Sequence, residues 1–414
     1  MAISVAERAE DIPGAQRHIL TVLVAAQVLS GAGLAAGVTV GALLAQDMLG
    51  STGLAGLPSA LGTAGSALAA VAVGRVSHAR GRRPGLAAGY LTGAIGSAGV
   101  IAAAVAGNVA LLFLALFVYG AGTATNLQAR YAGADLAAPA HRARAVSTVL
   151  VATTLGGVVG PNLTALTGDL ARGLGIPYLA GPFLLAGVAY ALAAVVLAVW
   201  LRPDPLLLAR TMSGEGTATD SRPGEADPHS ARRSGVLVGA LIMVLTQLVM
   251  VAIMTMTPVH MHDHGHGAAA TGLVIGIHIG AMYLPSPLTG WLVDRFGRLP
   301  IAAASGVTLL AAGIVAALAP DDSLAPFAVA LALLGLGWNF GLITGTAIIT
   351  DAVPLATRAK TQGLVDVSIA IAGAAGGMAS GFIVAAAGFP QLALGGGLLA
   401  LAILPAVAVA VRRR

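Results

Sequence analysis

The chain alternates long apolar stretches with short polar segments along its whole length. About twelve stretches are long enough to cross a bilayer as helices, because roughly 20 apolar residues span the hydrocarbon core. They begin near residues 19, 52, 84, 108, 145, 177, 235, 268, 299, 324, 361 and 390. The pattern predicts an all-α membrane protein with 12 transmembrane helices.

The composition agrees with this class. Of the 414 residues, 57% are hydrophobic and 9% are charged, whereas a soluble domain carries about 25% charged residues. The 56 glycines suit helices that pack closely in lipid. The chain contains no cysteine, which excludes disulfides and thiolate metal sites.

The distribution of basic residues predicts the orientation of the chain. All 22 lysines and arginines except Arg172 lie in the termini or in loops that fall on one side of the membrane. Basic loops stay in the cytoplasm. We therefore expect both termini to be cytoplasmic, in a bacterial cytoplasmic (inner) membrane, and we expect no nucleic-acid partner despite the net charge of +5.

The two halves of the chain repeat each other. Gly74, Gly81, Asp135, Arg142 and Arg144 correspond to Gly290, Gly297, Asp351, Arg358 and Lys360, each 216 residues later. Two separate motifs at one offset indicate duplication of a six-helix unit with the same topology. We predict an N-terminal bundle over residues 1–201, a flexible cytoplasmic linker rich in Pro, Gly and Ser over 202–234, and a C-terminal bundle over 235–414.

The repeated loop resembles the signature loop of the major facilitator superfamily. The later copy, GWLVDRFGR, is intact and contains Asp294, Arg295 and Arg298, whereas the earlier copy has His78 in the place of the acid. The resemblance implies the major facilitator fold, two six-helix bundles, and a cytoplasmic latch formed by the loop acid and a basic helix end. These four residues are candidate gating residues; alternatively, they are solvated charges that only set the topology.

Four residues form a candidate metal path. Met250-x-x-x-Met254 and His278-x-x-x-Met282 each place two side chains on one face of a helix. The pairs lie at equal distances from the turn between their helices, so Met250 is expected to face Met282 and Met254 to face His278. Three thioethers and an imidazole suit Cu(I). The matching positions of the first half are Leu34, Val38, Gly62 and Ser66. The alternative is that these methionines only fill space.

The segment between these two helices is rich in histidine and is expected to face the outside. A cation arriving there would first meet candidate ligands at His260, Met261, His262, His264 and His266. A solvated surface without a metal is an equally good interpretation of this segment.

The two spacings also resemble those of the CcoA-type copper importers, a branch of the superfamily. The resemblance implies that Met250, Met254, His278 and Met282 form a copper path. The expected function is alternating-access import of Cu(I) or a small copper complex, with copper as substrate and no cofactor. Related transporters without the Met motif are linked to riboflavin, so the scaffold alone does not fix the substrate.

A second hypothesis is a proton-coupled exporter or importer of small organic molecules, drug-like or riboflavin-like. Gly156-Gly157-Val-Val-Gly160-Pro161 resembles the Gly-Pro motif of drug antiporters in the superfamily. Asp366, inside a span, could carry a coupling proton, but pairing with Arg358 or Lys360 is the favoured expectation. A third hypothesis, a metal sensor that does not transport, is disfavoured by the short loops.

The remaining expectations concern chemistry and partners. No nucleophile–base pair or phosphate-binding loop stands out, so the chain is not expected to be an enzyme. The expected partners are a copper ion or small copper chelate and the lipid bilayer, and the chain is expected to act as a monomer. Six amides in or near the spans are expected to hydrogen-bond neighbouring helices: Gln27, Asn126, Gln128, Asn162, Gln247 and Asn339.

Overall fold

A computed structural model describes residues 12–49, 57–216, 228–266, 268–320 and 323–412. These residues form helices, turns and short connections, and no strand occurs among them. Contacts divide the chain into two compact units. Unit 1 comprises residues 1–138, 148–220 and 354–367, and unit 2 comprises residues 139–147, 221–353 and 368–414.

The helices of the first half follow the predicted apolar stretches. They are α2 (Ile12–Leu49), α3 (Leu57–Arg80), α4 (Arg82–Ala106), α5 (Val109–Ala134), η1 (Pro139–His141), α6 (Arg142–Asn162), α7 (Thr164–Gly173), η2 (Tyr178–Ala180), α8 (Gly181–Trp200) and α9 (Pro205–Gly216).

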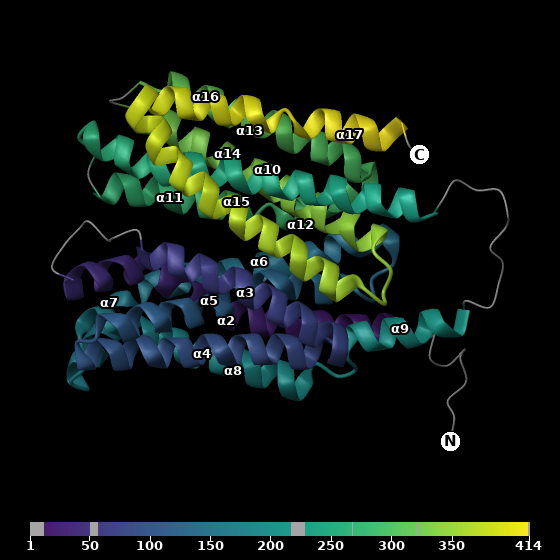
Figure 1. Cartoon of the computed structure of the whole chain (residues 1–414), viewed down its shortest axis with the longest axis horizontal. Coiled ribbons are helices and arrows are strands. Elements are labelled where there is room, and N and C mark those ends of the chain that lie inside the picture. The colour runs from purple at the N-terminus through teal and green to yellow at the C-terminus, as the bar shows by residue number, and fades with distance from the viewer. Residues whose placement is uncertain (1–11, 50–56, 217–227, 267, 321–322, 413–414) are drawn as a thin grey trace. The chain divides into compact units, whose positions relative to one another are not determined.

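The helices of the second half follow in the same way. They are α10 (Pro228–Asp263), α11 (Ala268–Tyr283), α12 (Ser286–Phe296), α13 (Arg298–Leu318), α14 (Leu324–Ala352), α15 (Arg358–Ala387), α16 (Phe389–Ala400) and α17 (Ile403–Arg412) (Figure 1).

The predicted membrane class is confirmed. Within the described residues, 11 helical segments are long and apolar enough to cross a bilayer. The stretch expected near residue 145 corresponds to α6, which is helical but is not among those 11. The pattern therefore located a helix at every predicted stretch, and the side chains of residues 157–162, at the end of α6, lie outside the described residues.

The expected linker is partly helical. Within the predicted range of 202–234, α9 covers Pro205–Gly216, and α10 begins at Pro228. Asp204 caps the start of α9, because its Oδ1 accepts hydrogen bonds from the backbone N–H groups of Leu206 and Leu207, at 3.0 and 3.1 Å. The predicted bundle boundaries stay a prediction, and the contact units differ from them by exchanging residues 139–147 and 354–367.

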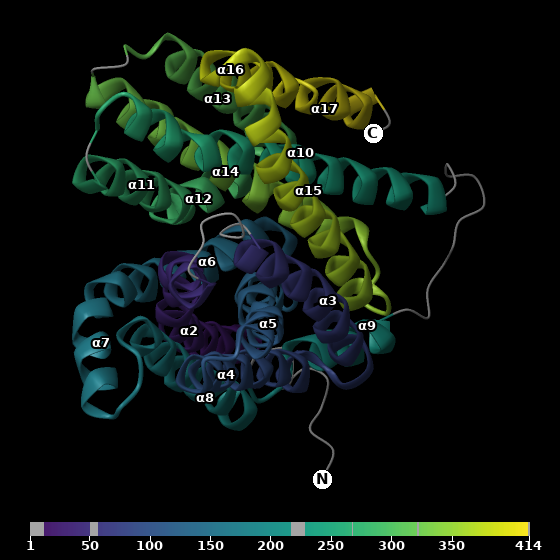
Figure 2. The same cartoon turned by 60° about the vertical axis from the view of Figure 1, so that its left-hand side comes forward.

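Small residues allow the helices within each unit to approach closely. In unit 2, α13 packs between α14 and α16 (Figure 2). Gly313 of α13 lies so near α16 that an added Cβ would stand 2.4 Å from the Ala393 carbonyl oxygen and 3.0 Å from the Gly397 Cα. In lipid, such backbone contact replaces the hydrophobic drive that operates in water.

We predict that Gly313→Ala destabilises the protein by about 1–3 kcal/mol, because the methyl group would meet backbone atoms that cannot rotate away. Gly395→Ala is the matched control: it lies in α16 with nothing within 4 Å of its added Cβ. That change should be neutral or stabilising, since alanine favours helix by about 1 kcal/mol. Thermal unfolding in detergent measures both, and equal melting temperatures for the two variants would contradict the packing account.

Candidate functional site: buried charge networks and a polar cluster

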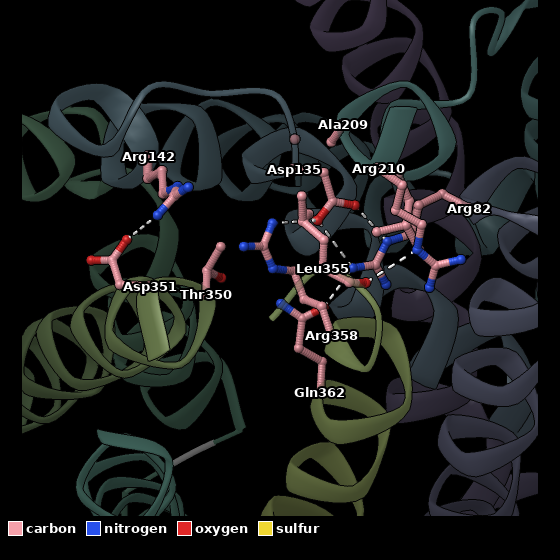
Figure 3. A network of polar contacts seen from close by, with 12 residues as sticks. Arg82, Asp135, Arg142, Ala209, Arg210, Thr350, Asp351, Leu355, Arg358 and Gln362 are labelled. Carbon is pink, nitrogen blue, oxygen red and sulfur yellow. Dashed lines mark hydrogen bonds and ion pairs between the residues drawn. The ribbon is translucent and has the colours of Figure 1, made fainter. Parts of the chain in front are cut away.

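Two ion networks occupy equivalent places in the two units, one buried in unit 1 and one exposed in unit 2. In unit 1, Asp135 binds Arg82 at 2.8 Å and Arg358 at 3.6 Å, and Arg82 also donates to the side chain of Gln362 (Figure 3). In unit 2, Asp351 binds Arg298 at 3.1 Å and also binds Arg142. Every member of one trio lies 216 residues from its counterpart, so the internal repeat extends to side-chain contacts.

The intact signature loop uses its acid to cap a helix. The Asp294 carboxylate accepts hydrogen bonds from the backbone N–H groups of Ala143 and Arg144, at 3.2 and 3.0 Å, at the first turn of α6. A negative charge at that end also complements the helix dipole. The side chain of Arg144 lies 3.9 Å away, whereas Arg295 is exposed. The acid therefore binds mainly backbone, with a basic side chain at longer range.

In the earlier copy of the loop, which lacks the acid, Arg210 of α9 makes contacts of a different kind. Its guanidinium donates to the His78 carbonyl at 2.9 Å and lies 3.4 Å from the His78 ring. It also donates to the carbonyls of Leu355 and Ala356, at 3.1 and 3.3 Å, immediately before α15 (Figure 3). A cation binding carbonyl groups thus joins the end of α3 to the start of α15.

A third ion pair has no counterpart in the repeat. Asp366 Oδ1 accepts from Arg130 Nη2 at 2.7 Å and from the Tyr131 hydroxyl at 3.1 Å. The expected pairing of Asp366 with Arg358 or Lys360 is therefore wrong. Arg130 lies in α5, far away in sequence, and its partner could not be inferred from local spacing.

The four predicted copper ligands lie on two helices that both pack on α14. His278 is buried, its Nδ1 bonds to the Leu331 carbonyl at 2.9 Å, and its Nε2 has no hydrogen-bond partner among the described residues. Met282 is partly buried beside Gly335 of α14. Met250 is buried and Met254 partly buried on α10. Both helices pack on α14 and contact each other over a smaller area, and no described contact joins the two pairs of side chains, so the joint site stays a prediction.

The histidines at the end of α10 contact aromatic rings. His260 stacks on Phe389 with 4.4 Å between ring centroids, and it lies 4.3 Å from the His264 ring. His266 lies near Phe327, and Met261 is buried. The side chain of His262 lies outside the described residues. Within the described part of the chain, no three His, Asp or Glu side chains converge as a metal site would require.

Unit 2 contains a polar aromatic cluster that was not predicted from the sequence. The Trp338 indole N–H donates to Gln247 Oε1 at 2.8 Å, and the Tyr283 ring meets the Trp338 ring edge-on at 5.6 Å. Gln247 was expected to hydrogen-bond a neighbouring helix, and it does so, but its aromatic partner was not predicted. Trp338 is one of three tryptophans in the chain and precedes Asn339 inside a span, a signal that could have identified the cluster.

Other amides confirm the expected role as links between helices. Gln27 of α2 donates to the Asn126 carbonyl and to the Thr153 hydroxyl. Asn339 of α14 donates to the Met282 carbonyl and to Ser286, both at 2.7 Å. The side chain of Asn162 and those of Gly157–Pro161 lie outside the described residues.

The architecture is that of a helical membrane transporter with an internal repeat. The family model described as "Major Facilitator Superfamily" matches residues 20–338 and 239–414, and the chain belongs to that superfamily. The chain is similar to YdeG of Bacillus subtilis, described as an "uncharacterized MFS-type transporter", with 58% identity over 94% of this chain and 91% of the relative. It is 54% identical to the similarly described YddS, over 94% and 90%.

More distant relatives include a transporter named for its substrate and two solved structures. The riboflavin transporter RfnT of Brucella anthropi is 34% identical over 86% of both chains. The solved human organic anion transporter MFSD10 superposes with a TM-score of 0.75 at 16% identity, covering 95% of this chain and 99% of that chain. The proton:xylose symporter XylE gives 0.73 at 15% identity, covering 94% of each chain. These two structures support the fold alone, and none of these relatives supports copper import.

The two loop copies make a testable pair, because the cysteine-free chain accepts single reporter cysteines. Ala143 and Ala359 are equivalent positions, and both are fully buried. We predict that Arg210→Ala raises the rate of maleimide labelling of Ala359→Cys about tenfold, since about 1.4 kcal/mol of lost local stability raises the open population tenfold.

The same substitution should leave the labelling of Ala143→Cys unchanged. Asp294→Ala should raise the labelling rate of Ala143→Cys and leave that of Ala359→Cys unchanged. If either substitution raises the labelling rates of both cysteines equally, Arg210 and Asp294 do not each stabilise only their own unit.

Proposed function

We propose that this transporter carries a small planar organic solute, riboflavin or a similar heterocycle, by alternating access across the bacterial cytoplasmic membrane. Family membership supports transport, and the similarity to the Brucella riboflavin transporter over 86% of both chains supports the solute class. The distribution of basic residues supports an orientation with both termini in the cytoplasm.

The cluster of Trp338, Gln247 and Tyr283 carries the proposal on the structural side. An indole offers a broad face on which a planar ring system can stack. The Gln247 amide both donates and accepts hydrogen bonds, as the imide edge of a flavin requires. The amide is already oriented by the Trp338 N–H, so binding needs little further ordering of the side chain.

We predict that Trp338→Ala lowers riboflavin transport by proteoliposomes at least tenfold, because it removes the ring and releases Gln247. Trp338→Phe retains a stacking face and should keep part of the activity with a weaker apparent affinity. Trp291→Ala is the control, since Trp291 is another tryptophan of unit 2 and is 42% exposed. Equal riboflavin transport by Trp338→Ala and Trp291→Ala would contradict a role for the cluster.

Copper import is a second candidate, and one observation favours it. The hydrogen bond from His278 Nδ1 to a carbonyl fixes the tautomer that leaves Nε2 free to bind a metal, and that buried nitrogen has no partner among the described residues. Met250, Met254 and Met282 would supply the thioethers.

For copper import we predict that His278→Ala abolishes copper accumulation in cells and that Met254→Leu sharply reduces it, with protein levels unchanged. Mass spectrometry of washed cells measures the metal. Riboflavin transport measured in the same variants separates the two candidates, because a copper path predicts no parallel loss of riboflavin.

A further inference from the structure

The span expected near residue 268 is broken into two helices in unit 2. The first piece, α11, ends at Tyr283, and the second, α12, begins at Ser286. Pro285 and Pro287 have no backbone N–H, so the two hydrogen bonds that would continue the helix through this point cannot form. A helix break inside a bilayer is tolerated where other groups of the protein satisfy the backbone.

The side chain of Asn339, in α14, joins the two pieces. Its Nδ2 donates to the Met282 carbonyl in the last turn of α11 and to the hydroxyl of Ser286 in α12, both at 2.7 Å. Its Oδ1 accepts a hydrogen bond from the Thr289 hydroxyl at 2.6 Å. Asn339 is fully buried, and both hydrogens of its amide nitrogen have acceptors within the protein. Since a carbonyl can only accept, these contacts also fix the orientation of the amide.

The internal repeat shows that the fold does not require this break. In the first half, the corresponding helix α3 runs without interruption from Leu57 to Arg80. The matching positions, 216 residues earlier, are Ala69 for Pro285, Val71 for Pro287, Val73 for Thr289 and Thr123 for Asn339. The members of the Trp338 cluster also match small residues: Gly31 for Gln247, Ala67 for Tyr283 and Gly122 for Trp338. The break, the amide and the cluster therefore go together in the second half.

The break lies directly beside that cluster. Tyr283 is the last residue of α11 and follows the carbonyl that Asn339 binds. Trp338 precedes Asn339 in α14, and its ring lies 5.6 Å from the Tyr283 ring, centroid to centroid, at an angle of 71°. One turn earlier, an added Cβ on Gly335 would stand 2.5 Å from the His278 carbonyl oxygen. Close approach at Gly335 and hydrogen bonds at Asn339 thus fix the end of α11, with Tyr283, against α14.

We propose that Asn339 is a positioning residue of the solute site, which holds the broken span so that Tyr283 stands against the Trp338 ring. Because the amide is occupied by protein groups, it acts through Tyr283 and not by touching the solute. A ring pair that is already in place lowers the ordering cost of binding a planar solute. Leucine, which is similar in size, would leave the Met282 carbonyl without this donor and free the end of α11. The inference rests on the proposed function, since it concerns the site proposed for a riboflavin-like solute.

The first test measures riboflavin transport by the full chain in proteoliposomes. Asn339→Leu should raise the apparent KM for riboflavin about tenfold and change the maximal rate much less, because it weakens binding and not the transport cycle. Tyr283→Ala should have the same effect. The double variant should have a KM no higher than that of Tyr283→Ala, since both substitutions act on one ring. Effects on KM that multiply in the double variant would overturn the proposal.

Two further variants separate positioning from stability. Asn126→Leu makes the same change at a buried amide of unit 1, which donates to the Ser30 hydroxyl at 2.8 Å, and it should leave the KM unchanged. If Asn339→Leu does not fold, Thr289→Val removes only the hydrogen bond to Asn339 Oδ1 and should raise the KM by a smaller factor. Thr289→Ser keeps the hydroxyl and should restore the wild-type KM. An equal KM in Thr289→Val and Thr289→Ser would count against the proposal.

A second measurement does not depend on riboflavin. The chain has three tryptophans, so Trp200→Phe with Trp291→Phe leaves Trp338 as the only fluorescent indole. In this background, Asn339→Leu and Tyr283→Ala should each increase the quenching of Trp338 by acrylamide, and the double variant should not exceed Tyr283→Ala. This result in a protein that carries no riboflavin would reject the proposed solute and uphold the positioning role. Additive quenching effects would overturn that role, whether or not riboflavin is carried.

Discussion

A charged group inside a bilayer has no water to solvate it, so each charge needs a partner in the protein. This requirement organises the polar part of the molecule. Asp135, which is buried, binds two arginines in unit 1, and Asp351 binds two in unit 2 at an exposed position. Each carboxylate thereby fixes the ends of several helices at once. Close packing through glycine determines how near the helices come, whereas these ion networks determine which helix ends meet.

The signature loops show how one structural task is met by different chemistry. Gly81 and Gly297 adopt the same left-handed backbone, with φ of 95° and 96°, which explains glycine at both positions. Beyond that turn the copies diverge. Asp294 binds the amide end of α6, whereas His78 is bound through its carbonyl by Arg210. At His78 the contact is made instead by α9, a helix outside the repeat.

Periodicity and the internal repeat predicted much of the fold, because a membrane span is a local property of the sequence. They also gave the equivalence of Asp135 with Asp351, which the structure extends to their arginines. Contacts between distant helices were not predictable in this way. The pairing of Asp366 with Arg130, the carbonyl contacts of Arg210 and the Trp338 cluster each join segments separated by scores of residues, and no local spacing encodes them.

The candidate metal residues illustrate the same limit. The spacing of Met250, Met254, His278 and Met282 fixes which face of each helix they share, and it says nothing about a third helix between them. The structure attaches both helices to α14. For this reason, the 34% identity to a riboflavin transporter is a stronger argument for a riboflavin-like solute than the Met and His spacing is for copper.

Accumulation by the wild-type protein tests the central claim most directly. Proteoliposomes under an imposed pH gradient would be offered labelled riboflavin and Cu(I) in parallel, with protein-free liposomes as the reference. The account predicts accumulation of riboflavin that collapses when a protonophore removes the gradient, and no accumulation of copper above the reference. Copper accumulation without riboflavin transport would contradict it.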